Sequence, residues 1–448
     1  MKHNNCRILL AIGSFLVVAC IITYLFIGVV MKEPKDTANS EGAVNEVTIK
    51  EDASEEANAE QAESTRLEST TQQDQEEQQD HEEHQAQQDH EDASAQQQDE
   101  IEEYLSQMTL EEKVAQLFII TPEALTGYST VTAAGEVTKE ALAQYPVGGL
   151  IYFTPNLTQE EQVKTMLEKT QEYAMELNGL PLFLSVDEEG GTVARIANNA
   201  AFDVTKVGDM ATIGEKKDYD LAYQAGVTIG SYLKKLGFNL DYAPDADVYS
   251  NPANEIVKRR SFGSDPELVS AMDLLVLKGL QEQGIYGVYK HFPGHGSTVG
   301  DTHEGYAYTE ETLDEMMADE IIPFQDAIGQ QLEFIMVGHI SAPNIIADET
   351  PSSLSSIMIT DILRGRLGFD GIVMTDALNM KAVQGQYSSA EAAILTIQAG
   401  TDILLMPENF KEAYDGVLEA VKSGKLSEER IDESVKRILK VKFVMRDK

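Results

Sequence analysis

Eight short apolar runs alternate with amphipathic helical patterns over residues 101–448, and this alternation predicts an α/β fold of the TIM type, a (β/α)8 barrel. The runs are too short and too apolar for strands of a one-sided sheet, so we expect a parallel sheet that is buried on both faces. An open doubly wound sheet is the alternative architecture. The strand candidates are residues 116–120, 148–153, 181–186, 239–243, 285–289, 334–337, 371–374 and 402–406. The helical patterns between them include residues 160–177, 219–236, 266–283 and 390–399.

An apolar segment precedes the predicted barrel domain. Residues 8–31 carry no charge, so residues 1–31 predict a cytoplasmic tip followed by a transmembrane or signal-anchor helix. Lys2 and Arg7 on its amino side should stay in the cytoplasm, which exports the rest of the chain. The sequence before Cys20 also resembles a lipoprotein cleavage site, with Cys20 as the lipid anchor, and a cleaved signal peptide is the third alternative. All three alternatives place the barrel outside the cytoplasm.

Residues 32–100 are rich in Glu and Gln and predict a disordered acidic linker, because they have too few large apolar side chains to fold alone. The whole chain has a formal net charge of −42, which disfavours nucleic acid as a partner, since phosphate binding needs clustered Lys and Arg. Cys6 and Cys20 are the two cysteines of the chain, so the predicted barrel has no disulfide and no thiolate metal site. We expect a monomer.

Polar side chains follow the predicted strands where they end. Asp187 follows the third strand, Asp245 and Asp247 follow the fourth, His339 follows the sixth and Asp376 follows the seventh. Because the carboxyl ends of barrel strands converge on one mouth, these groups should face a shared pocket. Asp376 taken alone is equally well explained as the N-cap of a helix.

The stretch after the fifth strand, residues 290–303, holds three of the eight histidines of the chain beside Lys290 and Asp301. His303 lies two residues from Asp301, and a carboxylate there can fix the tautomer of a histidine and raise its basicity, as proton transfer requires. A turn that caps the next helix is the structural alternative for this pair.

A metal site is the other chemistry open to this stretch, since His291, His295, Asp301 and His303 are plausible zinc ligands. Pro293 separates His291 from His295, so these two cannot form the i, i+4 pair of a helical zinc motif. We therefore expect neither a metal nor another cofactor.

Six motifs in this order closely resemble the barrel domain of glycoside hydrolase family 3; they occupy residues 108–117, 186–195, 243–247, 260–263, 290–296 and 374–376. The resemblance spans about residues 101–445. The pair Asp301 and His303 narrows it to the β-N-acetylglucosaminidase branch, in which a loop Asp-His pair serves as acid and base. Other branches take this acid from a glutamate in a second domain, for which we expect no room after the barrel.

The resemblance implies a retaining exo-glycosidase that hydrolyses terminal non-reducing β-N-acetylglucosamine, such as that of peptidoglycan fragments, through a covalent glycosyl-aspartate. Asp376 is then the nucleophile, and His303, oriented by Asp301, is the acid and base. The same resemblance implies that the sugar is bound by Asp187, Arg195, Arg260, Lys290 and His291. A β-glucosidase, a xylosidase or a glycoside phosphorylase of the family is an alternative, and so is a wall-binding protein without activity.

Two departures from the family pattern concern sugar binding. Glu188 stands where the family commonly has glutamine, and we expect it to add a negative charge near the sugar pocket. The chain has no tryptophan, so stacking on a sugar ring falls to Tyr and Phe.

Overall fold

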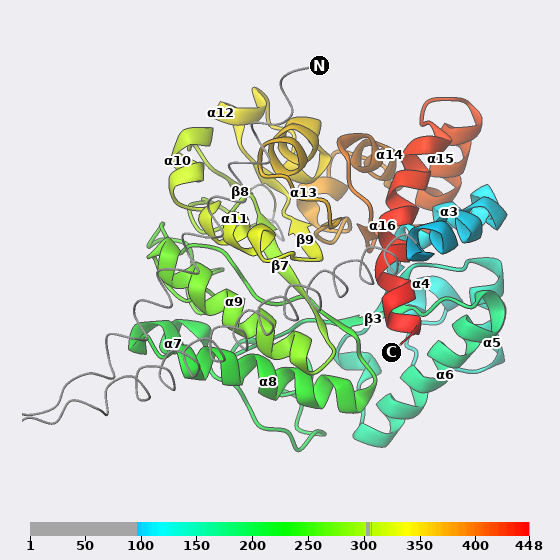
Figure 1. The fold of residues 1–448 in the computed structure, drawn as a ribbon, viewed down its shortest axis with the longest axis horizontal. Helices are drawn as coiled ribbons and strands as arrows, with labels where there is room; N and C mark the ends of the chain where they lie inside the picture. Colours follow the sequence, from blue (N-terminus) through cyan, green and yellow to red (C-terminus); the bar gives the residue numbers. More distant parts are fainter. Residues whose placement is uncertain (1–95, 302–304, 306, 448) are drawn as a thin grey trace, which may run out of the picture. The chain divides into compact units, whose positions relative to one another are not determined.

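Eight parallel strands form a nearly closed barrel in the computed structural model, which describes residues 96–301, 305 and 307–447 (Figure 1). The strand order around the sheet is β11-β9-β7-β6-β3-β2-β1-β12. A parallel bridge between Met374 and Ile403 joins the two end strands. The strands are β1 (Phe118–Ile120), β2 (Gly149–Ile151), β3 (Phe183–Val186), β6 (Leu240–Asp241), β7 (Tyr286–Phe292), β9 (Phe334–Val337), β11 (Ile372–Thr375) and β12 (Leu404–Leu405).

Helices surround this barrel, and their sequences explain where they begin and end. In α8 (Tyr219–Leu236), the Asp218 side chain caps the start by accepting a hydrogen bond from Leu221 N, and Gly237, with φ of 100°, caps the end. The covering helices are α3 (Leu110–Gln116), α5 (Glu136–Gln144), α6 (Glu160–Asn178), α8 (Tyr219–Leu236), α9 (Pro266–Glu282), α11 (Ile322–Gly329), the π-helix η3 (Ile357–Arg366), α14 (Ser389–Ala399), α15 (Phe410–Lys422) and α16 (Glu428–Arg446).

Short elements follow the strand ends on the side of the barrel mouth. They are α4 (Pro122–Thr126), η1 (Thr154–Asn156), β4 (Glu188–Gly190), β5 (Val193–Ala194), α7 (Met210–Lys216), β8 (Ala307–Tyr308), α10 (Leu313–Ala318), β10 (Ile340–Ser341), α12 (Pro343–Ile346), η2 (Ser352–Leu354) and α13 (Lys381–Gln384). Segments that follow strands in such barrels carry the binding and catalytic groups.

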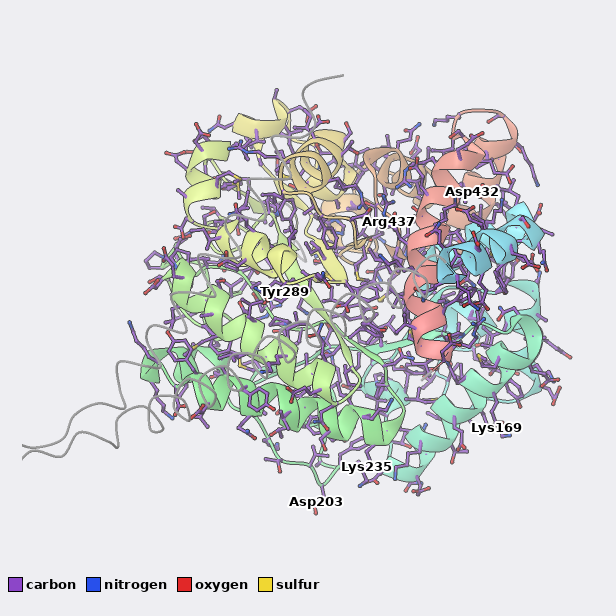
Figure 2. All side chains as sticks on the ribbon, viewed as in Figure 1. Lys169, Asp203, Lys235, Tyr289, Asp432 and Arg437 are labelled. Atoms are coloured by element: carbon purple, nitrogen blue, oxygen red, sulfur yellow. The ribbon has the colours of Figure 1, made fainter. Side chains whose placement is uncertain are left out.

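The core consists of the barrel interior and the layer between barrel and helices. Figure 2 shows Lys169, Asp203 and Lys235 at the periphery of the molecule, whereas Tyr289 of β7 lies inside it and is fully buried. Every residue of β1, β2, β3, β9 and β11 is also buried. Burial on both faces explains why these strands show continuous apolar runs in the sequence.

A helix over residues 96–107 packs against α16, so the last five residues of the predicted linker are helical. Ile101 and Leu105 on one face of this helix are buried, and the Tyr104 ring lies 5.7 Å from the Phe443 ring, edge to face. Glu100 also pairs with Arg446 at 2.9 Å. This helix belongs to the folded domain.

The predicted fold class is corrected in one respect: the barrel is present, but the described residues contain no transmembrane helix. Within the described part of the chain, no helix is both long enough and apolar enough to cross a membrane. The longest helices, α6 and α16, each span 19 residues but carry many charged side chains on their outer faces. The segment at residues 8–31 and most of the predicted linker lie outside the described residues.

Candidate active site

The ends of β3 and β7 place Asp187 and Lys290 side by side at the mouth. Lys290 Nζ lies 3.2 Å from Asp187 Oδ1, although the two residues are 103 positions apart in the sequence. Arg195 Nη2 contacts the other oxygen, Asp187 Oδ2, at 3.3 Å. The Asp187 and Arg195 side chains keep 19% and 33% of their surface exposed, so both can still bind a ligand. Three predicted sugar-binding residues therefore lie together.

Glu189 joins the remaining predicted arginine to this group, and sequence reasoning missed it. Lys290 Nζ lies 2.6 Å from Glu189 Oε1, and Arg260 donates to both Glu189 oxygens at 2.7 and 2.8 Å. Burial raises the pKa of Glu189, but the charges of Arg260 and Lys290 outweigh burial and hold it below its usual value. An ionised Glu189 fixes both cations, as bidentate pairs do.

His291 is held by Asp247 in the loop after β6. His291 Nδ1 lies 2.7 Å from Asp247 Oδ2, and Asp247 Oδ1 accepts from the backbone N–H groups of His291 and His295 at 3.1 and 2.6 Å. Burial opposes ionisation of Asp247, but the charge of His291 outweighs it and lowers the Asp247 pKa. Asp247 therefore fixes both the ring and the turn that follows it.

Asp376 follows β11 and is partly exposed at the mouth. Its backbone N–H donates to Val337 O at 2.9 Å, and its Oδ1 accepts from Ala377 N at 2.7 Å. Burial raises the pKa of this carboxyl, but the charges of His291 and His339 and the Ala377 N–H outweigh burial, so the Asp376 pKa lies below its usual value. The next helix, α13, begins only at Lys381, so Asp376 is not its N-cap. The result is an ionised, partly exposed carboxylate directly after β11.

His339, which follows β9, contacts the backbone next to Asp376. Its Nε2 lies 3.0 Å from Ala377 O, and its Nδ1 lies 2.6 Å from Ser353 Oγ. These contacts orient the ring so that Nε2–H donates to the carbonyl next to the Asp376 carboxylate. His339 therefore holds the backbone of Ala377, the residue that follows the predicted nucleophile.

The predicted acid and base loop is described only in part. Asp301 is described and partly exposed, whereas His303 lies outside the described residues. At the base of the loop, Val299 and Tyr308 exchange two backbone hydrogen bonds of 3.0 and 3.1 Å. The strand β8 that ends the loop pairs with β10, just after His339. This pairing places Asp301 on the mouth side. That His303 lies close enough to Asp376 to act with it stays a prediction.

Asp245, Asp247 and His291 come closest to a metal-binding arrangement among the described residues, with one ligand atom of each within 4.8 Å of the others. Arg260 Nε lies 2.8 Å from Asp245 Oδ2, and Asp247 already accepts three hydrogen bonds. A cation here would have to displace the guanidinium. The set also differs from the zinc ligands considered from sequence, since His295 Nδ1 contacts Thr298 Oγ1 at 2.6 Å instead.

Glu188 does not present its charge to the mouth as expected, because its side chain is fully buried. Its oxygens accept from Ile196 N, Ala197 N and Tyr232 Oη, each at 2.8 Å. Successive residues of a strand face opposite sides, so Glu189 takes the mouth side and Glu188 the side of α8.

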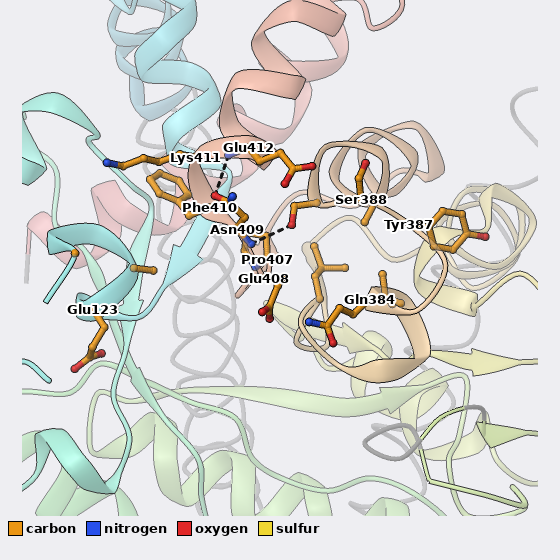
Figure 3. Close-up of a pocket in the computed structure, with 16 residues that line it drawn as sticks. Glu123, Gln384, Tyr387, Ser388, Pro407, Glu408, Asn409, Phe410, Lys411 and Glu412 are labelled. Carbon is orange, nitrogen blue, oxygen red and sulfur yellow. Dashed lines mark hydrogen bonds between the residues drawn. The ribbon is translucent and has the colours of Figure 1, made fainter. Parts of the chain in front are cut away.

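A cavity of about 670 Å³ extends the mouth beside β11, β12 and β1 (Figure 3). In Figure 3, Glu123 lies on one side of it, and Gln384 and Glu408 lie on the other. Leu378, two residues after Asp376, also lines it. Its aromatic lining consists of Tyr387 and Phe410, consistent with the lack of tryptophan.

Residues 109–441 match the family model described as the glycosyl hydrolase family 3 N terminal domain. The chain belongs to glycoside hydrolase family 3. The predicted family is thus confirmed. Five of the six motifs that carried the resemblance lie at the mouth side of the barrel, whereas residues 108–117 contain α3, which precedes β1.

Family 3 relatives with similar sequences are named for hexosaminidase activity. Beta-hexosaminidase A of Pseudoalteromonas piscicida is 31% identical over 324 residues, 68% of this chain and 54% of that protein. Beta-hexosaminidase LpqI of Mycobacterium tuberculosis is 35% identical over 272 residues, 59% of this chain and 68% of that protein. The aligned segment therefore spans only about half of the first relative and two thirds of the second.

Among solved structures, a family 3 beta-N-acetylglucosaminidase from Paenibacillus sp. str. FPU-7 superposes with a TM-score of 0.70 at 36% identity. The match covers 76% of this chain and 64% of that one. A beta-N-acetylhexosaminidase from Beutenbergia cavernae gives a TM-score of 0.66 at 27% identity, over 75% of this chain and 99% of that one.

Proposed function

We propose that the protein is a retaining β-N-acetylhexosaminidase that removes terminal non-reducing β-N-acetylglucosamine. The observation that carries this proposal is Asp376, a carboxylate kept ionised at the end of β11 and faced by His291 and Lys290. The names of the family 3 relatives support the choice of an amino sugar.

In the first step of the proposed mechanism, Asp376 attacks the anomeric carbon while the glycosidic bond breaks. His303, oriented by Asp301, gives its proton to the departing oxygen, so the leaving alcohol is neutral. In the second step, neutral His303 takes a proton from water, and the resulting hydroxide displaces Asp376 from the sugar. Two displacements at one carbon retain its configuration.

The sugar is held in this proposal by the charged group at β3 and β7. The partly exposed Asp187 and Arg195 offer an acceptor and a donor to ring hydroxyls. Buried Lys290 holds Asp187, and Arg260 holds Glu189, the other carboxylate that Lys290 contacts. His291 offers its second ring nitrogen, since Asp247 holds the first. All these residues come from one chain, so a monomer suffices.

The natural substrate that we propose is a peptidoglycan-derived fragment outside the cytoplasm, which assigns the enzyme to wall turnover or recycling. Export rests on the apolar segment before residue 32, and we propose lipid attachment at Cys20 as the mode of anchoring. Replacing Cys20 by Ala should move the protein from the detergent phase to the aqueous phase in a partition experiment. Unchanged partition would contradict lipid attachment.

Two measurements test the proposed activity. Rates on aryl β-N-acetylglucosaminide and aryl β-glucoside should differ in favour of the amino sugar, and a preference for the glucoside would contradict the substrate. Trapping with a fluorinated amino sugar, followed by mass mapping, should label the peptide that contains Asp376. A label on another peptide would show that the nucleophile is misassigned.

A further inference from the structure

Glu320 is a fully buried carboxyl group behind the loop that leads from β7 to Asp301. Its Oε1 accepts a hydrogen bond from Ser250 Oγ at 2.7 Å, and Ser250 lies three residues after Asp247. Its Oε2 has no hydrogen-bond partner among the described residues. A buried carboxylate oxygen without a partner is costly, so this side chain needs a reason to be there.

Glu320 packs directly on the backbone of the turn that follows β7. A Cβ on Gly294 would lie 2.5 Å from Glu320 Oε2 and 2.6 Å from Glu320 Cβ, so only glycine leaves room for this side chain. Gly294 lies between His291 and His295, whose backbone N–H groups Asp247 holds. Through Ser250 and Gly294, Glu320 therefore connects the loop after β6 with the loop after β7.

The charged groups that face Glu320 are acidic. They are Asp247 in the loop after β6, Glu311 in the segment before α10, and Asp319 directly after α10. Burial raises the pKa of Glu320 to about 8, the Ser250 hydrogen bond acts in the opposite direction, and the three acids raise the pKa further. At pH 7 the group is neutral, and its ionisation adds a negative charge beside Asp247.

We propose that neutral Glu320 is a positioning residue that holds the loops after β6 and β7 together, and that its ionisation loosens the turn carrying His291 and leading to Asp301. The inference rests on the proposed hydrolase activity. Activity should then fall at alkaline pH with the neutral fraction of Glu320. One pH unit above its pKa, about a tenth of the molecules keep the proton.

The test is the pH profile of kcat/KM with the 2,4-dinitrophenyl glycoside of β-N-acetylglucosamine. This leaving group departs without a proton, so the first step no longer depends on the protonation of His303. The wild type should lose about tenfold in kcat/KM between pH 7 and pH 9, following the neutral fraction. Glu320→Gln, which is neutral at every pH and close in shape, should change by less than about twofold over the same range.

Two further variants separate positioning from a merely structural role. Ser250→Ala removes a hydrogen bond that favours the ionised form of Glu320. It should therefore shift the fall of kcat/KM at alkaline pH, the alkaline limb of the profile, to higher pH. Glu320→Ala leaves a space under the turn and should lower kcat/KM at every pH, whereas Glu320→Gln should restore it. Ser270→Ala is the matched control, because Ser270 Oγ bonds Asp326 at 2.6 Å between α9 and α11, and its limb should stay unchanged.

The outcomes are distinguishable. An alkaline limb that is the same in the wild type, Glu320→Gln and Ser250→Ala overturns the inference, since the limb then belongs to another group. A wild type without a limb on the dinitrophenyl substrate also overturns it. Failure of the wild type to cleave any aryl β-N-acetylglucosaminide contradicts the proposed function instead. Thermal melts at each pH separate loss of folding from loss of activity.

Discussion

At the scale of single residues, Asp376 is ionised because of its surroundings and is rigid because of its neighbours. Positive charge on His291 and His339 overcomes the effect of burial on its pKa. The Ala377 N–H donates to Asp376 Oδ1, and His339 holds the carbonyl oxygen of the same residue, Ala377. A nucleophile needs both properties, since it must be charged and must keep its line of attack.

Replacing Asp376 by Ala should lower kcat by more than about a thousandfold, because removal of the proposed nucleophile removes the covalent step. Azide added to this variant should restore part of the rate on an activated aryl substrate, because the small anion fits the space left by the carboxylate. The product should be the α-glycosyl azide, which NMR identifies. Formation of the β-azide would place the nucleophile elsewhere.

Glu188 offers a second test at this scale, because three donors surround its carboxylate and none of its partners accepts. Glu188→Gln replaces one acceptor oxygen with an NH₂ group that faces a donor. We expect the free energy of unfolding to fall by about 1–3 kcal/mol, the cost of a lost buried hydrogen bond. KM should stay unchanged, since the side chain lies outside the pocket. A raised KM with unchanged stability would return Glu188 to the sugar site.

At the scale of elements, β7 and the β4 segment show how a strand distributes its groups. Lys290 meets Asp187 and Glu189, while its neighbour His291 meets Asp247. The sequence predicts that these groups gather, because parallel strands converge at their carboxyl ends. It does not predict which of Glu188 and Glu189 faces the mouth, because β4 is short and carries no apolar alternation that would set its register.

The helix over residues 96–107 shows where composition misleads. Glu100 and its acidic neighbours continue the composition of the linker, but Ile101 and Leu105 are four residues apart and form a buried stripe. A stripe of two residues is too weak a signal in a sequence. The contact with Phe443 of α16, more than 300 positions away, makes the helix stable.

Ile101→Ala in the full-length chain should therefore lower the free energy of unfolding by about 2–4 kcal/mol, as large-to-small changes in a core do. Glu103→Ala on the exposed face of the same helix is the control and should change it by less than about 0.5 kcal/mol. Denaturant titration measures both variants. Equal effects would mean that this helix contributes nothing through its buried face.

At the scale of the whole molecule, the two ends of the barrel have different chemistry. The mouth gathers Asp187, Lys290 and Asp376 from distant strands, as the pattern of polar residues after apolar runs predicts. The position of Glu320 is not predicted, because it depends on a glycine whose missing Cβ leaves space for another segment. Close approaches of this kind arise from packing across the whole fold and leave no local signal in the sequence.

At the opposite end, Lys442 of α16 is fully buried. Lys442 Nζ donates to Gln116 Oε1 at 2.8 Å and lies 5.1 Å from the centre of the Phe183 ring. Gln116 is the last residue of α3, before β1, and Phe183 is the first of β3, so this lysine lies under the barrel. Burial lowers the pKa of Lys442 to about 7. The charged form therefore destabilises the folded protein.

The sign of the pH dependence follows from this depressed pKa. Between pH 7 and the ordinary lysine value near 10.5, the unfolded chain binds more protons than the folded one, so the contribution of Lys442 becomes less destabilising as pH rises through this window. The destabilisation caused by charged Lys442 is largest below pH 7, with an upper bound of about 5 kcal/mol.

Lys442→Met keeps the volume and removes the charge but leaves Gln116 Oε1 unpaired, at a cost of about 1 kcal/mol. We expect the variant to be more stable than the wild type by about 2–4 kcal/mol at pH 6 and by much less at pH 10, as measured by denaturant titration at both values. A stability difference that is the same at the two pH values would show that Lys442 keeps its ordinary pKa under the barrel.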